Sequence, residues 1–119
     1  MASPIAPKRG EIWFAQLAPL NQSAGTEIQK SRPVLIVGNN IVNERRRTVL
    51  VVPLATSGGK ATANPPITVS VNCAGKSAVA VIDQLRALDK SRLAKLMDII
   101  QPEQLESVVA ALGQILEIT

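Results

Sequence analysis

Apolar residues gather in short runs along most of the chain, and many of these runs are rich in β-branched side chains. Short runs of this kind are typical of β-strands. They predict strands over residues 11–17, 33–37, 48–54, 67–71, 78–82 and 84–88, the last two being either a strand pair or one strand bent around Asp83. Residues 93–99 fit either a last strand or a helical turn. Strict alternation over 67–71 predicts that Ile67, Val69 and Val71 face the core.

The remaining segments are polar and predict loops, one turn and a tail. The strand over 48–54 is expected to be central until Pro53, which has no amide proton, ends its hydrogen bonding. Residues 39–47 predict a short helical turn anchored by Ile41 and Val42. Residues 18–31 and 55–66 read as loops, and long loops in compact domains often carry function. Residues 1–7 read as a mobile tail, and residues 8–119 as one domain.

The clearest helical pattern lies at the end of the chain, over residues 101–118. Pro102 suits the first helical position, and Glu103 suits the positive end of the helix dipole. One stripe at helical spacing holds Leu105, Val108, Val109, Leu112, Ile115 and Leu116. Many short strands followed by one helix predict an α+β, mainly β fold, with a small curved sheet or open barrel and a C-terminal helix packed on it.

The composition of the chain restricts the possible catalytic groups more than it restricts the possible binding partners. With 13 Lys and Arg against 9 acidic residues, the net charge of +4 is compatible with a polyanionic partner but does not require one. Cys73 is the single cysteine, so no internal disulfide can form, which favours a reducing compartment. No apolar run is long enough to cross a membrane, and residues 1–10 lack the apolar core of a signal peptide. We therefore expect a cytoplasmic protein with no membrane contact.

Histidine and tyrosine are absent from the chain. The usual general base near neutral pH and the commonest transition-metal ligand are therefore missing. One cysteine and singly scattered acidic residues leave no convincing zinc site. Neither a metal nor a cofactor is expected, so any chemistry must come from Arg, Lys, Asp, Glu, Ser, Thr or backbone amides.

Arg32 stands where a polar loop meets the apolar strand 33–37, and Pro33 biases it toward an extended conformation. An arginine in this place is either a solvated strand cap or a binding group at a rigid edge. If the loops before Arg32 and after Leu54 meet at one end of a barrel, an arginine, hydroxyls, loop amides and a lysine converge. Such a group suits a phosphate.

Each further candidate has a plain structural alternative. Residues 56–59 have ordinary linker composition and lack the spacing of a Walker motif. The triplet Arg45–Arg47 is either a solvated face or a grip on a nucleic-acid backbone. Asp83 is either a buried structural carboxylate paired with Arg86 or a site residue. Trp13 and Phe14 are expected in the core, with at most one of them free to stack on a base.

Five segments in unbroken order carry a family resemblance: KRGEIW at 8–13, GTE at 25–27, KSRPVLIV at 30–37, VPLATS at 52–57 and DQLRALDKSRL at 83–93. Together with the terminal helix they resemble the MazF/PemK (Kid) family of toxins from bacterial type II toxin–antitoxin systems. The resemblance implies an SH3-like or CcdB-like barrel, a homodimer, and a cognate antitoxin that covers the RNA groove. It also implies a metal-independent endoribonuclease that cuts single-stranded RNA, especially mRNA, at short sequences and so inhibits translation. Cleavage by the RNA's own 2′-hydroxyl leaves 2′,3′-cyclic phosphate and 5′-hydroxyl ends.

By this resemblance Arg32 is the catalytic arginine, stabilising charge on the phosphate. The family usually has threonine directly after Val-Pro-[Leu/Val/Ile], whereas here Ala55 intervenes. Either Ala55 is an insertion and Thr56 is catalytic, which we expect, with Ser57 as the fallback, or Ala55 occupies the place of the threonine. The supporting candidates are Glu27, Ser57 and Asp83, and the RNA-binding candidates are Lys30, Lys60, Arg86, Arg45 and Arg46.

Two positions depart from a Kid-type site, because Thr26 and Val81 replace a histidine and an arginine, leaving only Asp83. Two other functions therefore stay open. One is a degenerate, non-catalytic homologue that acts as a binding module, and the other is a CcdB-like gyrase poison on the same fold. Arg32 with the Thr-Ser pair favours the nuclease, because a gyrase poison has no need of a group directed at phosphate.

Overall fold

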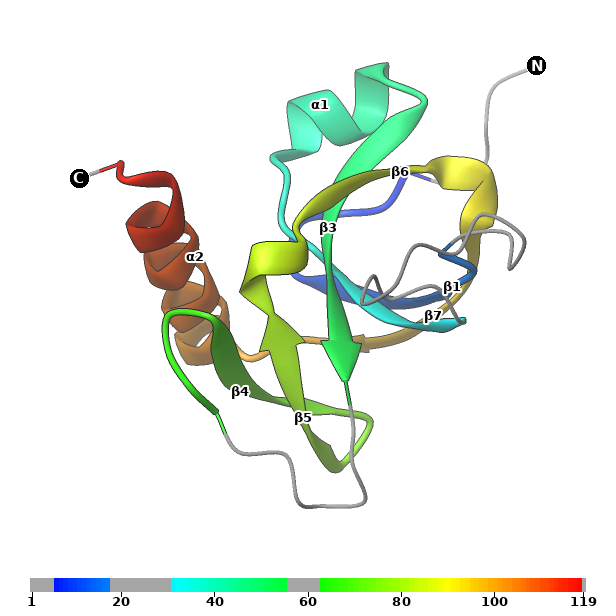
Figure 1. Ribbon diagram of the computed structural model, residues 1–119. Helices are drawn as coiled ribbons and strands as arrows, with labels where there is room; N and C mark the ends of the chain where they lie inside the picture. Colours follow the sequence, from blue (N-terminus) through cyan, green and yellow to red (C-terminus); the bar gives the residue numbers. More distant parts are fainter. Residues whose placement is uncertain (1–5, 18–30, 56–62, 119) are drawn as a thin grey trace.

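The computed structural model describes residues 6–17, 31–55 and 63–118. Within them the chain forms a curled, mainly antiparallel sheet with a helix at its C-terminal end (Figure 1), which confirms the predicted fold class. The strands are β1 (Glu11–Ala15), β2 (Arg32–Ile36), β3 (Thr48–Ala55), β4 (Thr68–Cys73), β5 (Lys76–Val81), β6 (Arg86–Asp89) and β7 (Leu93–Ile99). The helices are α1 (Asn40–Arg45) and α2 (Pro102–Leu116), with single 3₁₀ turns η2 (Ile82–Gln84) and η3 (Lys90–Arg92). No helix in these ranges is long and apolar enough to cross a membrane.

β3 is the central strand, in the order β4-β5-β3-β2-β1-β7. β5 pairs with its last residues, Leu54 and Ala55, whereas β6 pairs with Thr48–Val51. β5 and β6 are therefore two strands that follow the same edge of β3 and are separated by η2, so the chain bends around Asp83, as the second alternative expected. The expectation that Pro53 ends the pairing of β3 is wrong, because a missing amide proton removes only one donor and β3 continues to Ala55.

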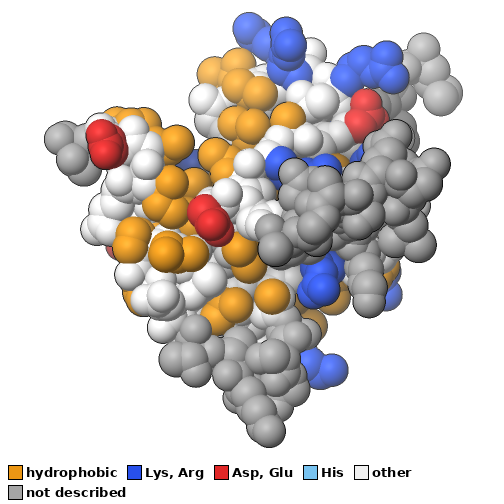
Figure 2. All heavy atoms as spheres, viewed as in Figure 1, with side chains coloured by type: hydrophobic (Ala, Val, Ile, Leu, Met, Phe, Trp, Pro, Cys, Tyr) orange, Lys and Arg blue, Asp and Glu red, His pale blue; other side chains and the backbone are white. Residues whose placement is uncertain are grey.

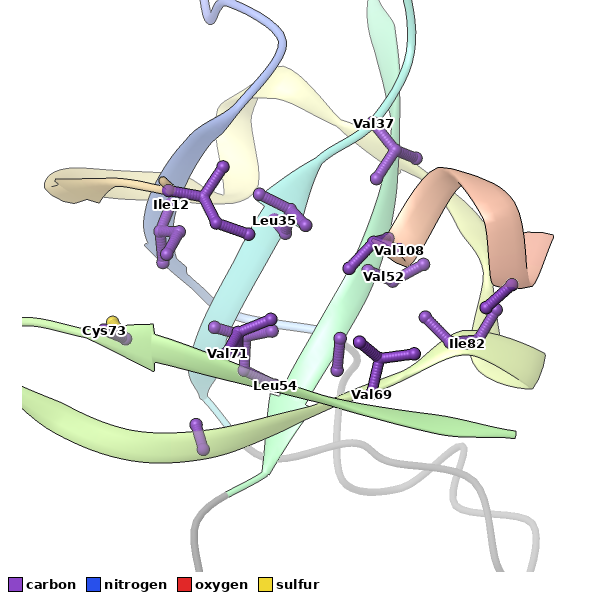
Figure 3. Packing of buried hydrophobic residues seen from close by; sticks show 14 residues of the cluster. Ile12, Leu35, Val37, Val52, Leu54, Val69, Val71, Cys73, Ile82 and Val108 are labelled. Atoms are coloured by element: carbon purple, nitrogen blue, oxygen red, sulfur yellow. The ribbon is translucent and has the colours of Figure 1, made fainter. Parts of the chain in front are cut away.

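Two apolar cores lie on opposite faces of the sheet. The larger core lies between the sheet and α2, where Leu35, Val52 and Val108 meet (Figure 3). The smaller core holds Val34, Ile36 and residues of β1, β3, β6 and β7. β2 contributes to both cores through alternate residues, which explains why its sequence is apolar without interruption.

The terminal helix packs through a narrower face than its sequence predicts. Val108 and Ala111 are buried, but Val109 and Leu116 are 36% and 53% exposed, so these two do not belong to the packing stripe. Because one helical face contacts only a narrow strip of a curled sheet, residues at the margins of the stripe remain in water. Ile67 is likewise 47% exposed, since it lies in the turn before β4 and not in the strand.

α1 is held by asparagines, not by the predicted apolar anchor Ile41, which is 59% exposed. The side chain of Asn39 accepts a hydrogen bond from the amide of Val42 at 3.0 Å, which caps the helix. The fully buried Asn43 donates from Nδ2 to the carbonyl oxygen of Gly38 at 3.1 Å. These polar contacts fix the helix whose last residue is Arg45. Of the predicted tail, residues 1–5 lie outside the described ranges, as do residues 18–30 and 56–62 of the predicted loops.

Candidate active site

Arg32 begins β2 between two alanines. Ala15 of β1 is its partner across one strand pair. On the other side Val34 is opposite Pro53, and continuing this antiparallel register by two residues brings Ala55 opposite Arg32. Directly opposed side chains in a sheet share a face, so both methyl groups lie beside the arginine. Small neighbours leave room for a long side chain to lie along the sheet.

The Nε atom of Arg32 is buried and has no hydrogen-bond partner among the described residues, although the residue as a whole is only partly buried. Buried side-chain donors are nearly always paired, because leaving one unpaired costs its lost hydration. A simple solvated strand cap does not explain a buried donor. An acceptor supplied by a ligand does explain it.

Arg86 approaches the same place from β6. Arg86 and the buried Leu88 are two residues apart on β6, so their side chains lie on the same face of the sheet, that of the smaller core. Val34 belongs to the same core, and by alternation along β2 Arg32 lies on this face as well. Nη2 of Arg86 donates to the carbonyl oxygen of Leu17 at 3.0 Å. Leu17 is two residues beyond Ala15, the partner of Arg32. The two arginines therefore both lie at the C-terminal end of β1.

A pocket of about 430 Å³ opens beside Arg86 and is lined by residues 83–87. Asp83 lies in η2 at the bend and is exposed, so the alternative that makes it a buried structural carboxylate is wrong. Asp83 and Arg86 line this pocket, and Arg86 also reaches the C-terminal end of β1, where Arg32 lies. Arg45 and Arg46 lie elsewhere, at the C-terminal end of α1.

Glu27, Lys30, Thr56, Ser57 and Lys60 lie outside the described residues. The structure does define the position before Thr56. Ala55 belongs to β3, and no bulge interrupts the pairing of β2 with β3 over its recorded register. By alternation its methyl group is on the face of Arg32. This is the geometry expected if Ala55 occupies the place of the family's threonine.

Two features of the site, the contacts of Ala15 and Leu17, had no separate signal in the sequence. The role of Ala15 as neighbour and of Leu17 as acceptor depends on pairing between distant strands. Trp13 packs against the smaller core but is only partly buried, and its Nε1 donates to Oε1 of Glu11 at 2.9 Å. Its ring is therefore a wall of the smaller core and not a free stacking platform.

Comparisons with known proteins agree with this geometry. Residues 8–116 match the family described as PemK-like, MazF-like toxin of type II toxin-antitoxin system. The endoribonuclease PemK of Escherichia coli is 37% identical over 112 residues, covering 92% of this chain and 81% of that protein. The endoribonuclease EndoA of Bacillus subtilis is 30% identical over 107 residues, covering 88% and 90%. The chain thus belongs to the PemK/MazF family of toxins.

Solved structures support the same assignment at the level of the fold. The crystal structure of MazF from Deinococcus radiodurans superposes on this chain with a TM-score of 0.78 at 27% identity, covering 96% of this chain and 99% of that one. A mycobacterial endoribonuclease in complex with its cognate antitoxin superposes at 0.74 with 22% identity, covering 96% and 98%. Neither the family nor these relatives point to a gyrase poison.

Proposed function

We propose that this chain is the endoribonuclease toxin of a type II toxin–antitoxin system, cutting single-stranded RNA at a short sequence without a metal ion. The observation that carries the proposal is the buried, unpartnered Nε of Arg32 between Ala15 and Ala55. By its resemblance to the family, the segment that begins at Lys30 makes Arg32 the candidate for the family's catalytic arginine. The relatives PemK and EndoA, which are named endoribonucleases, supply the reaction.

Arg32 would act on the phosphate that is being displaced. The 2′-hydroxyl oxygen attacks the neighbouring phosphorus, the bond to the 5′-oxygen breaks, and a 2′,3′-cyclic phosphate and a 5′-hydroxyl remain. Negative charge builds on the non-bridging oxygens during the attack. A guanidinium that offers Nε and a terminal nitrogen side by side can bind two of these oxygens at once. Its Nε pays no hydration cost at that moment, because it is already out of water.

The proton steps need other groups, because the pKa of arginine is too high for a free base. We assign Thr56 to bind the substrate near the reacting hydroxyl, with Ser57 as the alternative. Glu27 is the candidate acceptor for the proton of the 2′-hydroxyl. Asp83, exposed in the pocket of residues 83–87, is a second candidate carboxylate. The leaving 5′-oxygen takes up a proton as it departs.

One observation favours a second candidate function. The side chain of Ala55 falls on the face of Arg32, where a family threonine would be useful. If Thr56 does not reach the substrate, the chain is a degenerate homologue that retains the barrel and binds partners without cleaving RNA. Exchanging the two side chains distinguishes the readings.

The assembly belongs to the same proposal. We assign a homodimer located in the cytoplasm, with a cognate antitoxin as its partner, by analogy with the family and with a mycobacterial relative solved with its antitoxin. Lys30, Lys60 and Arg86 are assigned to the RNA backbone. In this arrangement the antitoxin would compete with RNA for the surface around Arg32.

The test is a cell-free translation reaction with wild type, Thr56→Ala, Ala55→Thr and the double exchange Ala55→Thr/Thr56→Ala. The proposal predicts that wild type stops translation and fragments the mRNA, that Thr56→Ala does neither, and that the double exchange stays inactive. Activity in the double exchange would assign the threonine position to residue 55. Intact mRNA with wild type, together with inhibited DNA supercoiling by gyrase, would overturn the nuclease in favour of a gyrase poison.

A further inference from the structure

A second basic site lies at the end of the molecule that holds α1, away from Arg32. A pocket of about 310 Å³ is lined there by Glu44, Arg45, Arg46, Arg47, Asp89 and Lys90. Four of these side chains are cationic and two are acidic, so the lining carries an excess of positive charge. Figure 2 shows Lys and Arg side chains gathered at this end of the molecule.

Three elements build this pocket. α1 ends at Arg45, the chain turns through Arg46 and Arg47, and β3 begins at Thr48. β6 ends beside them, because Thr48 is the pairing partner of Asp89. The amide of Lys90 donates to the carbonyl oxygen of Arg47 at 2.8 Å, which fixes the two chain segments relative to one another.

The acidic residues that line the pocket neutralise only part of its positive charge. Hydrogen bonds from Ser91 lower the pKa of Asp89 below its ordinary value, with smaller contributions from Arg47 and Arg92. Asp89 is therefore ionised at neutral pH and interacts with both of those arginines. Arg45 and Arg46 are exposed and do not contribute to this shift. The described lining therefore presents these two guanidinium groups at the surface beside two acidic residues, Glu44 and Asp89.

β6 connects this pocket to the candidate active site. Ala87 lines the pocket near Arg86, and Lys90 lines the pocket near the arginine triplet. Asp89, the last residue of β6, also lines the second pocket, and at about 3.4 Å per strand residue the two steps from Ala87 to Asp89 span about 7 Å. A stacked nucleic-acid strand advances by about 3.4 Å per nucleotide, so a single RNA strand of a few nucleotides lying along β6 can reach both pockets.

We propose that Arg45, Arg46 and Lys90 form a second phosphate subsite, which binds the backbone of the substrate RNA beyond the segment held at the candidate active site. The inference rests on the proposed function and adds a path for the RNA along β6. Guanidinium forks match phosphate oxygens in pairs. Among the described residues, the lining of the pocket has no large apolar side chain, so it suits a phosphate better than a peptide that needs an apolar anchor.

The experiment measures binding of single-stranded RNA to Arg32→Ala protein, which should not cleave it, at several salt concentrations. The test variant adds Arg45→Ala and Arg46→Ala. The matched control adds Lys76→Ala and Lys95→Ala, which remove the same charge at exposed positions of β5 and β7 that line neither pocket. A further variant with Arg45→Lys and Arg46→Lys retains the charge. Thermal unfolding of every variant confirms that it is folded.

Each phosphate contact with a single strand contributes about 0.7 to the slope of log affinity against log salt. The test variant should therefore lose about 1.4 from that slope and bind a long RNA roughly five- to tenfold more weakly, since exposed ion contacts are each worth a few-fold. The lysine variant should retain most of the slope. The Lys76/Lys95 control should change the slope little.

Equal slopes in the test and control variants would overturn the subsite. Unchanged RNA binding together with weaker binding of polyglutamate would also overturn it, in favour of an acidic peptide. Cleavage of RNA by the wild-type chain is measured in parallel. Its absence would refute the proposed function, whereas a subsite failure leaves wild-type cleavage intact, so the two failures are distinguishable.

Discussion

Replacing Arg32 by methionine should abolish cleavage while leaving the fold as stable as before, or more so. Arg32 is the first residue of β2, and its Nε is buried without a partner. Methionine retains an unbranched apolar stem beside Ala15 and Ala55 but has no donor. Function and stability are therefore expected to change in opposite directions, which a purely structural arginine would not allow.

The expected loss of cleavage rate and the expected gain of stability both follow from the burial of the Arg32 Nε donor. A donor directed at developing negative charge contributes about 10²- to 10³-fold to the rate, or about 2.7–4 kcal/mol. An unsatisfied buried donor costs about 1–3 kcal/mol of stability. Because the rest of the guanidinium is partly exposed, we expect a gain at the low end, about 1 kcal/mol. For a domain of this size that gain raises the melting temperature by roughly 4 °C.

The assay combines single-turnover cleavage of RNA with urea unfolding of the same samples. Lys76→Met serves as the control, because Lys76 is exposed at the start of β5 and should change neither measurement. Cleavage within a factor of three of wild type would refute the catalytic assignment. A loss of more than about 1 kcal/mol of unfolding free energy in Arg32→Met would show that the guanidinium supports the fold instead.

Further predictions concern the scaffold. Val108→Ala, which empties a fully buried position between α2 and the sheet, should cost about 2 kcal/mol in urea unfolding, whereas Leu116→Ala at an exposed position should cost less than about 0.5 kcal/mol. Backbone hydrogen bonds lower the pKa of Asp98 below its ordinary 3.8, so the ionised carboxylate stabilises the fold above that pH, and this stabilisation is lost as the pH falls through the pKa of the folded state. Asp98→Asn should therefore flatten the acid limb of a curve of unfolding free energy against pH, and an unchanged limb would contradict this. Gly10→Ala should lower the unfolding free energy by about 1 kcal/mol or more, because φ is +94° there; an unchanged melting temperature would refute the strain argument.

The sequence predicts well those elements whose burial is set by local pattern. β2 is apolar at every position after Pro33 because it is buried on both faces, and β4 alternates because one face meets water. Pro102 marks the start of α2 correctly. The family resemblance also placed the fold class and Arg32 at a strand edge, and the family itself is confirmed by comparison.

What escapes the sequence depends on pairing between distant residues. Nothing local indicates that Arg86 donates to Leu17, 69 residues earlier in the chain. The bend between β5 and β6 follows from how each pairs with β3, not from the residues at the bend. Asn43 is polar and has no sequence signal of burial, yet it is fully buried, where it donates a hydrogen bond to the carbonyl oxygen of Gly38. A polar residue in a core reveals itself only when its partner is in place.

The measurement that tests the central claim most directly is cleavage of a long single-stranded RNA by the purified chain with EDTA present, with both product ends mapped. The account predicts discrete fragments with 2′,3′-cyclic phosphate and 5′-hydroxyl ends. A 2′-deoxy substitution at the cleaved nucleotide should abolish the cut, and Arg32→Ala should lose it as well. Folded wild-type protein that leaves diverse RNAs intact, or a cut that survives the 2′-deoxy substitution, would contradict the account.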